Sequence, residues 1–374
     1  MIEEGVELQK EQHAIERIDR QRRLFSTFKT DGLSNYLERE KKSVATDRIV
    51  TLNGWSNTYH NTYSHMPLQL LHLLLPNQTE TISRSGGYWL QIGGVGVAVN
   101  PGTGFLERMH KAGYHVWDID HIIVTDGEMA SSSEIEKIYS FNKEINSLLQ
   151  QWELDSHIIS YYLHPTAYEQ YATRLRPTIR KEVSTVHCLE TFSQSPETVD
   201  LNEFVSFDFC AATPSPSSSL MLRIRRHKEN QELNRIGFLT NSPSHESQVD
   251  FFTNCQTLIL GIGKASFDDP GQSLGYLGVI QLIDREIPPR TVILSEQDFS
   301  EGDTRLEALH YIHEQTSTNP SSLLPAEEGL TLHLDTLQVT TPSLQTPTPV
   351  HAIKIIRSKG PFSRLTFLDE YGIL

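Results

Sequence analysis

The stretch that decides the fold is Asn100-Pro-Gly-Thr-Gly-Phe-Leu-Glu-Arg-Met-His-Lys-Ala-Gly113, followed by Asp118-Ile-Asp-His-Ile-Ile-Val-Thr125. An apolar run, 95–99, leads into it and predicts a strand. Gly102 and Gly104 allow a tight turn at the end of that strand. A helix over 105–112 follows and ends at Gly113, a residue type typical of helix C-caps. A second apolar strand, 122–125, completes a strand–turn–helix–strand unit.

Similar units extend outward in both directions. We predict strands and helices in alternation, but without the regularity of a doubly wound sheet. Two mixed sheets with helices on the outside therefore fit the pattern better. The predicted strands are 49–52, 88–92, 95–99, 122–125, 158–162, 206–210, 220–224, 236–239, 257–260 and 291–294. The predicted helices are 105–112, 133–149, 166–175 and 276–286.

The quoted stretch resembles the metallo-β-lactamase superfamily, in which a strand ends in Asp-Pro-Gly-x-Gly and a helix ends at Ala-Gly. The resemblance continues in order through Leu52-Asn-Gly-Trp-Ser-Asn57, Ile236-Gly-Phe-Leu-Thr-Asn-Ser242, Ser273-Leu-Gly-Tyr-Leu-Gly278 and Thr291-Val-Ile-Leu-Ser-Glu296. The Ser273-Leu-Gly stretch is similar to the phosphodiesterase and tRNase Z branches, where a helix begins His-Leu-Gly. The resemblance implies a four-layer αββα sandwich, an α/β (α+β) fold, with a helical N-terminal extension.

The family's chemistry requires His-x-His-x-Asp-His after Thr125, because two zinc ions need imidazole ligands and a bridging carboxylate. No ligand position of that pattern is kept. In this former metal cleft, Asp126 and Glu128 occupy the first two histidine positions, Ala130 the aspartate position and Ser131 the last histidine position. Farther along, Thr213 stands for a histidine, Asn241 for the bridging aspartate, Ser273 for the histidine before Leu-Gly, and Glu296 for the last histidine.

Other residues supply weaker candidates. None of the 16 histidines restores a ligand spacing. Lys264, in Gly261-Ile-Gly-Lys264, follows a strand but lacks the full phosphate-binding loop, so a plain turn is the simpler interpretation. Arg305 could offer a guanidinium to an anion, with an intradomain salt bridge as the default. Both are retained as possible ligand-binding residues.

Composition limits the class of protein. The chain has 374 residues, 37% hydrophobic and 21% charged, which is typical of a globular protein. Its net charge is −15, which disfavours binding of extended nucleic acid. We read no signal peptide and no apolar run near the ~20 residues needed to span a membrane. Three cysteines without a CxxC pattern indicate buried thiols. We predict a cytoplasmic protein.

Three regions are predicted along the chain. Residues 1–46 form a helical arm with nine acidic and nine basic side chains, suited to packing on its own domain or to a dimer contact. Residues 47–340 form the metallo-β-lactamase-like domain, with linkers or surface loops at 316–322 and 340–350. Residues 341–374 form a C-terminal segment that packs on the body or on a partner, with a strand-like run at 352–356.

Three functional hypotheses follow. The first is a catalytically inactive protein without a cofactor, acting as a regulatory or scaffold subunit, with a nucleotide-type ligand in the former cleft. The second is a phosphodiesterase-like hydrolase in which Asp126, Glu128, Asn241 and Glu296 hold Mg²⁺ or Mn²⁺, which prefer oxygen ligands. The third is an interaction module that uses only its surface. A cleft filled by its own side chains would favour the third. In each case we expect a homodimer or a subunit of a complex.

Overall fold

The computed structural model describes residues 47–52, 86–151, 154–175, 183–190, 195–214, 219–228, 231–263, 273–297, 305–317, 322–342, 344–357 and 363–367. All of them belong to one compact unit, Thr46–Leu374. The predicted arm, 1–46, lies outside the described residues, as do Lys264 and positions 53–57.

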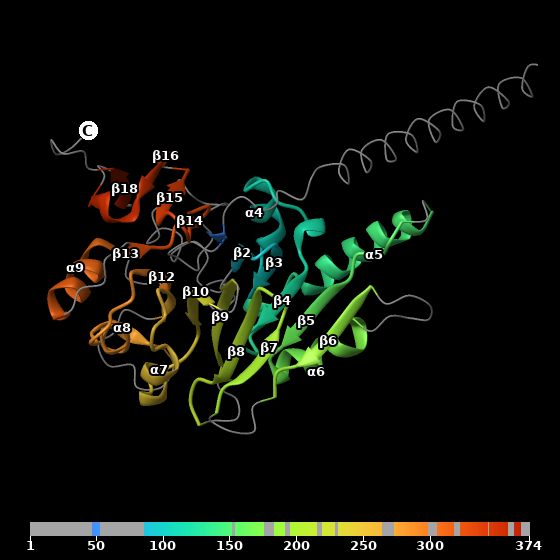
Figure 1. Cartoon of the computed structure of the whole chain (residues 1–374), viewed down its shortest axis with the longest axis horizontal. Coiled ribbons are helices and arrows are strands. Elements are labelled where there is room, and N and C mark those ends of the chain that lie inside the picture. The colour runs from blue at the N-terminus through green and yellow to red at the C-terminus, as the bar shows by residue number, and fades with distance from the viewer. Residues whose placement is uncertain are drawn as a thin grey trace, which may run out of the picture. The chain divides into compact units, whose positions relative to one another are not determined.

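The described residues form a first sheet of nine strands in the order β16-β15-β14-β1-β2-β3-β4-β5-β6 (Figure 1). Its members are β1 (Arg48–Thr51), β2 (Tyr88–Ile92), β3 (Val95–Val99), β4 (His121–Val124), β5 (Ile159–Leu163), β6 (Ser184–Cys188), β14 (Thr331–His333), β15 (Gln338–Thr341) and β16 (Leu344–Pro349). Strands β3 to β6 are parallel to one another, and the remaining pairs are antiparallel. The sheet is therefore mixed, as predicted.

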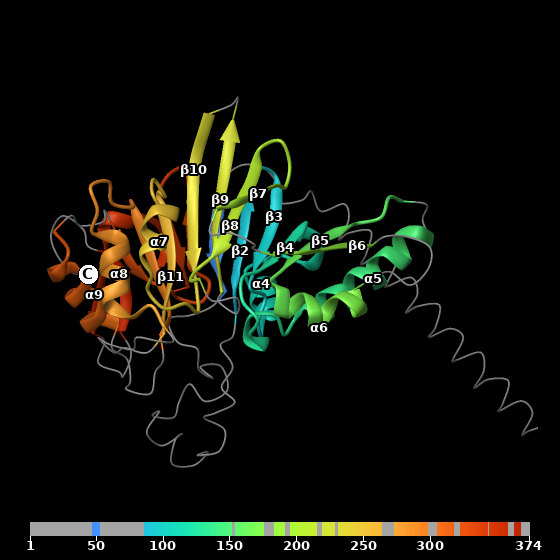
Figure 2. The same cartoon turned by 90° about the horizontal axis from the view of Figure 1, so that it is seen from below.

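A second sheet of seven described strands has the order β13-β12-β11-β10-β9-β8-β7. Its members are β7 (Glu197–Asp200), β8 (Val205–Ala211), β9 (Leu220–Lys228), β10 (Gln231–Leu239), β11 (Thr257–Gly263), β12 (Thr291–Gln297) and β13 (Ser322–Pro325). Strands β10 to β13 are parallel, whereas β7 to β10 are antiparallel. The antiparallel pair β9–β10 extends beyond its neighbours (Figure 2).

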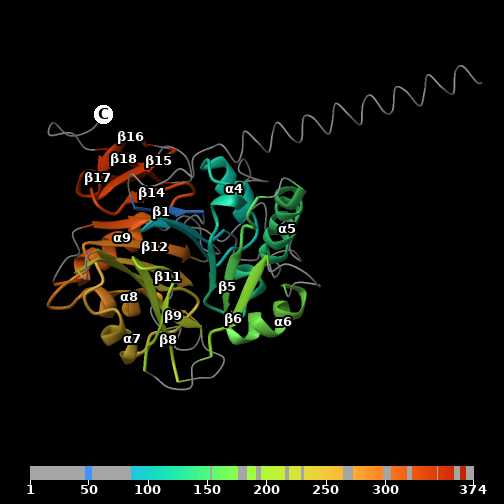
Figure 3. The ribbon, with the colours of Figure 1, turned by 45° about the vertical axis from the view of Figure 1, so that its right-hand side comes forward.

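Three apolar clusters define four layers. The central cluster lies between the sheets and joins residues such as Leu90 and Val97 of the first sheet to Phe207 and Ile236 of the second. A second cluster packs the other face of the first sheet against α4 (Phe105–Lys111), α5 (Ile135–Gln151) and α6 (Pro165–Leu175). A third packs the outer face of the second sheet against α7 (Glu246–Phe251), α8 (Gly275–Ile283) and α9 (Arg305–Gln315). Figure 3 shows the two helical layers on opposite sides. This is the predicted αββα sandwich.

The deciding stretch folds as its sequence indicates. Gly104 has a φ of 80° immediately before α4, and Gly113 has a φ of 85° just after it. The amide of Gly113 donates to the carbonyl of His110, and that of Tyr114 donates to Met109, which closes the helix end. Because α4 fills the crossover from β3 to β4, the ends of both strands lie side by side.

The observed elements differ from the prediction mainly at the edges of the sheets. Residues 340–350, predicted to be a linker or surface loop because of their proline and threonine content, instead form β16 and the end of β15. An edge strand tolerates proline where the missing amide would face away from the ladder. The strand-like run at 352–356 is β17 (Ile353–Arg357), which pairs with β18 (Ser363–Phe367). Short α7 and α9 had no predicted counterpart.

Two simpler expectations can be compared with the described residues. None of the three cysteines, all of which the structure describes, forms a disulfide; Cys210 and Cys255 are buried as predicted, whereas Cys188 is half-buried. Among the described helices, none has both the length and the apolar character to cross a membrane.

Candidate functional site

The candidate site lies where strand ends of both sheets meet along one edge of the sandwich. Strand β4 leads into Thr125, and β10 leads into Thr240. The amide of Leu220, at the start of β9, donates to the carbonyl of Thr125 over 2.6 Å. The sheets are therefore joined at this edge by a hydrogen bond. Two positions predicted for the former metal cleft, Asp126 and Asn241, follow directly after Thr125 and Thr240.

Three uncharged side chains form a buried polar knot at the centre of this edge: Asn100, Thr125 and Thr240. Each is at most 3% exposed. Asn100 Nδ2 donates to Thr125 Oγ1 at 2.8 Å and to Thr240 Oγ1 at 3.1 Å. Asn100 Oδ1 accepts from the amide of Thr125 at 2.9 Å. The hydroxyls of Thr125 and Thr240 lie 3.3 Å apart. The Asn100 side chain, which directly follows β3, thus links the two sheets. Its amide nitrogen donates hydrogen bonds and its amide oxygen accepts one.

Asp126, the first predicted cleft residue, is buried and organises its own loop. Its Oδ1 accepts from the amide of Glu128 at 2.9 Å, and its Oδ2 accepts from Ser131 Oγ at 2.8 Å. Glu128 itself is exposed. Two predicted cleft residues, Asp126 and Ser131, are therefore in contact. Both carboxylate oxygens of Asp126 accept hydrogen bonds within the loop, whereas the Glu128 side chain is exposed to solvent.

Glu296, the last predicted cleft residue, is buried in β12 at a φ of 56°. Its Oε2 lies so close to β11 that a Cβ added to Gly261 would be only 2.6 Å away. Burial first, and then the nearby charge and hydrogen bond of Glu296, raise the pKa of Tyr88 well above its ordinary value of 10.0. The Tyr88 hydroxyl also lies 2.5 Å from Ser295 Oγ. Glu296 is thus engaged with a tyrosine of the first sheet.

The remaining predicted positions are spread along the same edge. Thr213 follows β8 and is half-buried, and Asn241 follows β10 at a φ of 51°. The carbonyl of Asn241 accepts from Ser219 Oγ at 3.0 Å. Ser273 precedes α8, is buried, and its Oγ has no hydrogen-bond partner. Arg305 is the first residue of α9, and Lys264 is outside the described residues.

These residues do not fit the metal centre that the resemblance implies. In the part of the chain that the structure describes, no three His, Cys, Asp or Glu side chains lie close enough together to hold a metal ion. A zinc pair needs several imidazole or thiolate ligands around each ion, whereas the described residues of this edge offer amides, hydroxyls and the carboxylates of Asp126 and Glu296. The proposed oxygen set fails for the same reason, since Glu128 does not join Asp126 and Glu296.

Two further residues shape this edge and were not among the predicted candidates. Asn100 is the first. The sequence contained a signal for it, because Asn100 stands where the family pattern has aspartate. Glu134 is the second. It is buried, its Oε1 accepts from the amide of Gly104 at 3.2 Å, and its Oε2 accepts from that of Leu106 at 2.8 Å. Its role has no sequence signal, because the partners lie about 30 residues away.

Comparison with solved structures identifies the architecture. A metallo-β-lactamase fold protein, YhfI from Bacillus subtilis, matches with a TM-score of 0.56 at 13% identity, over 77% of this chain and 99% of that chain. The chain has the metallo-β-lactamase fold. A diphosphatase of the PhnP family matches over 77% of this chain and 97% of its own, at 12% identity and a TM-score of 0.51. The long form of RNase Z from yeast matches with a TM-score of 0.51 at 11% identity, over 79% of this chain and 43% of that one.

The metallo-β-lactamase fold confirms the resemblance predicted from the 100–125 stretch. No protein-family model matches the sequence, and no curated protein matches it. Identities of 11–13% show a shared fold and carry no activity with them. In this chain the polar knot lies at the same edge of the sandwich as Asp126 and Asn241, which directly follow Thr125 and Thr240.

Proposed function

We propose that this chain is a catalytically inactive protein of the metallo-β-lactamase fold that acts as a binding or scaffold subunit. The polar knot of Asn100, Thr125 and Thr240 carries the proposal. Its donors and acceptors are satisfied by one another, so the centre of the edge is a structural junction between the sheets. A buried network that is satisfied internally stabilises and rigidifies a fold.

The same observation supports action through the surface rather than through the former cleft. A ligand at this edge, whether a nucleotide or a divalent ion, would have to displace hydrogen bonds that are already made in a buried setting. Breaking such a bond without replacing it costs about 1–3 kcal/mol for each unsatisfied group. The filled edge therefore favours an interaction module over a ligand sensor.

Metal content and hydrolysis test this proposal together. Protein purified without chelator is analysed for bound elements and assayed on bis-p-nitrophenyl phosphate with added Zn²⁺, Mn²⁺ or Mg²⁺. We expect no stoichiometric metal and no turnover above the buffer rate. Turnover that is lost in Asp126→Ala but kept in Asp155→Ala, an exposed aspartate outside the edge, would overturn the proposal.

We further propose that the protein works as a homodimer or as a subunit of a larger complex. A protein that does not catalyse a reaction at this edge would act by binding a partner. Multi-angle light scattering of the full chain tests the homodimer. A monomer at ~10 μM, which excludes dissociation constants near or below that value, would leave only the hetero-complex.

A further inference from the structure

Strand β6, the last strand of the first sheet, has a free main-chain edge. It pairs with β5 on one side, and no described strand lies on its other side (Figure 2). The carbonyl of Val183 and the amide of Leu189 form hydrogen bonds with β5. Because the main-chain groups of successive strand residues point in alternate directions, those of Val186 and Cys188 point away from β5. The described residues supply no hydrogen-bond partner for these outward groups.

This edge is accessible over the second part of β6. Thr185, Val186 and Cys188 are half-buried and His187 is exposed, whereas Ser184 is buried. The accessible stretch contains no formally charged residue, no glycine and no proline, and two of its residues are β-branched. Such a stretch is well suited to adding another strand.

The other three edges of the two large sheets each carry a feature that opposes strand addition. Strand β16 contains Pro347 and Pro349, which have no amide hydrogen to donate. Strand β13 is short, largely buried and ends at Pro325. Strand β7 is short and has an exposed acid at each end, Glu197 and Asp200. Charges, prolines and short length are the devices by which proteins keep sheet edges from pairing.

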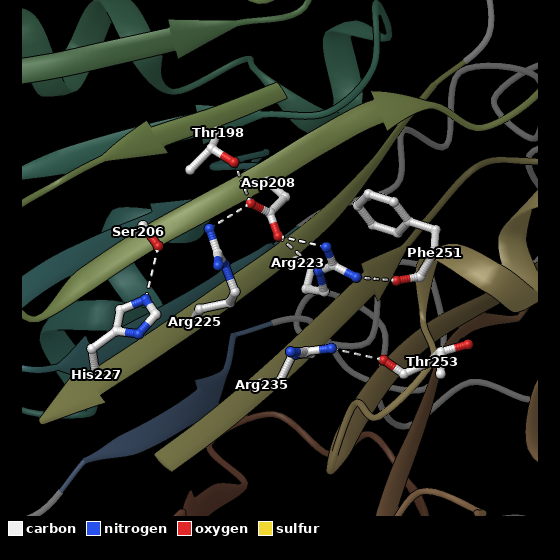
Figure 4. Close-up of polar contacts among 9 residues, drawn as sticks. All are labelled: Thr198, Ser206, Asp208, Arg223, Arg225, His227, Arg235, Phe251 and Thr253. Atoms are coloured by element: carbon white, nitrogen blue, oxygen red, sulfur yellow. Dashed lines mark hydrogen bonds and ion pairs between the residues drawn. The ribbon is translucent and has the colours of Figure 1, made fainter. Parts of the chain in front are cut away.

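The acids of β7 oppose self-pairing in particular. An antiparallel pairing of the whole strand with a second copy would place Glu197 opposite Asp200, and like charges directly opposite are destabilising. The next acid in this sheet, Asp208 of β8, is neutralised within the chain: Arg223 Nε and Arg225 Nη2 each donate to it at 2.8 Å (Figure 4). The free edge of β6 has no acid to neutralise.

The β6 edge is complementary to itself. Two copies can meet antiparallel about a two-fold axis at His187. Val186 of each copy then lies opposite Cys188 of the other. Because the main-chain groups of both residues point outward, each of these pairs can exchange its N–H···O hydrogen bonds. The buried Ser184 takes no part in this register.

His187 has a side chain that suits a position on the axis. Its ring is stacked on that of Tyr162 in β5, with the ring centroids 5.0 Å apart and the planes at 15°. Because His187 is exposed, the ring face turned away from Tyr162 is available to the same residue of a second copy. The two histidines form a non-hydrogen-bonded pair, in which side chains come closest. With a net charge of −15 per chain, we expect two copies to meet where neither presents a like charge.

We propose that two copies of this chain dimerise through β6, which joins their first sheets edge to edge. The inference rests on the homodimer named under the proposed function and identifies the surface that forms it. It does not depend on whether the chain is catalytically inactive.

Variants at β6 test this interface in the full chain, with sedimentation equilibrium as the measurement. Val186→Pro removes an outward donor and spares the hydrogen bonds to β5. His187→Glu and His187→Lys each place like charges opposite one another across the axis. Each variant should weaken dimerisation about tenfold or more. An equal mixture of His187→Glu and His187→Lys should recover the dimer, because opposite charges then meet.

Glu197→Lys, on the edge of β7, is the matched control and should not weaken the dimer. Circular dichroism checks that the variants are folded; the two His187 variants change only an exposed side chain. If the folded β6 variants dimerise as tightly as the unmodified chain, if Glu197→Lys weakens the dimer equally, or if the mixture shows no recovery, the assignment to β6 is overturned while the homodimer stands. A monomeric unmodified chain at ~10 μM overturns both, without bearing on catalytic inactivity.

Discussion

At the scale of single residues, the exchange of one acid for its amide changes what the edge can do. Asn100 takes the place of the family's aspartate at the end of β3 and keeps a left-handed φ of 51°, which asparagine and aspartate both tolerate. The amide, unlike a carboxylate, donates as well as accepts. It therefore binds two threonine hydroxyls and one backbone amide with no charge to be balanced.

Asn100→Asp tests this interpretation. The introduced carboxylate would lose both donated hydrogen bonds and bury an uncompensated charge, so we expect the free energy of unfolding to fall by about 2–4 kcal/mol at pH 7. The loss should shrink at low pH, because a protonated carboxyl can donate again. Urea denaturation at several pH values measures both effects.

Asn254→Asp is the matched control, since Asn254 also has a left-handed φ, 63°, but is exposed. It should change the unfolding free energy little. If Asn100→Asp were as stable as this control, or if added Zn²⁺ stabilised it strongly, the edge would be a metal site awaiting one carboxylate rather than a structural junction.

At the scale of elements, the turn between β3 and α4 depends on an acid from another helix. Glu134, just before α5, accepts from the amides of Gly104 and Leu106. These amides begin α4 and have no partner within the helix itself. The amide of Glu134 in turn donates to the carbonyl of Pro101 at 3.2 Å. The start of α4 and the start of α5 are therefore tied to each other.

Glu134→Ala should weaken this connection. Two partly buried amides lose their acceptor, so we expect a loss of about 1–2 kcal/mol in unfolding free energy and faster hydrogen exchange at Gly104 and Leu106. Glu136→Ala, which removes an exposed glutamate of α5 paired with Arg174, should cost less than about 0.5 kcal/mol. If both variants lowered the unfolding free energy equally, the hydrogen bonds from Gly104 and Leu106 to Glu134 would contribute nothing to stability.

At the scale of the whole molecule, ion pairs supplement the apolar core that joins the two sheets. Arg226 of β9 contacts Asp47, before β1, at 2.5 Å, and Asp335, after β14, at 3.0 Å. Nearby in the first sheet, Arg48 of β1 is registered opposite His333 of β14. Burial first, and then the charge of Arg48, lower the pKa of His333 below its ordinary value of 6.5.

This shift predicts a stability that depends on pH. Above pH 6.5 His333 is neutral in both the folded and the unfolded chain. As the pH falls below that value, the unfolded chain takes up the proton first, so stability is lost until the folded pKa is passed. We expect His333→Gln to flatten the part of the stability curve that lies below pH 6.5. His310→Gln, at an exposed position on α9, serves as the control and should leave the slope unchanged.

The sequence by itself determined the fold and the loss of the family's ligands. The turn glycines, the helix stop at Gly113 and the apolar strands are local signals, and the order of the family's motifs extended them to a whole sandwich. The absence of histidine at each ligand position is likewise a property of the chain. These features can be predicted from the sequence because each depends on residues that are close together in the chain.

Only the tertiary structure decided which side chains meet. It placed Glu128 in solvent, joined Asn100 to Thr240 across 140 positions of sequence, and formed strands from the proline-rich segment 340–350. It also buried Asn142 and Asn146 in α5, where their amides donate to the carbonyl of His157, and set Arg225 opposite Arg235. These contacts depend on strand register and on the packing of distant elements, which local sequence patterns do not encode.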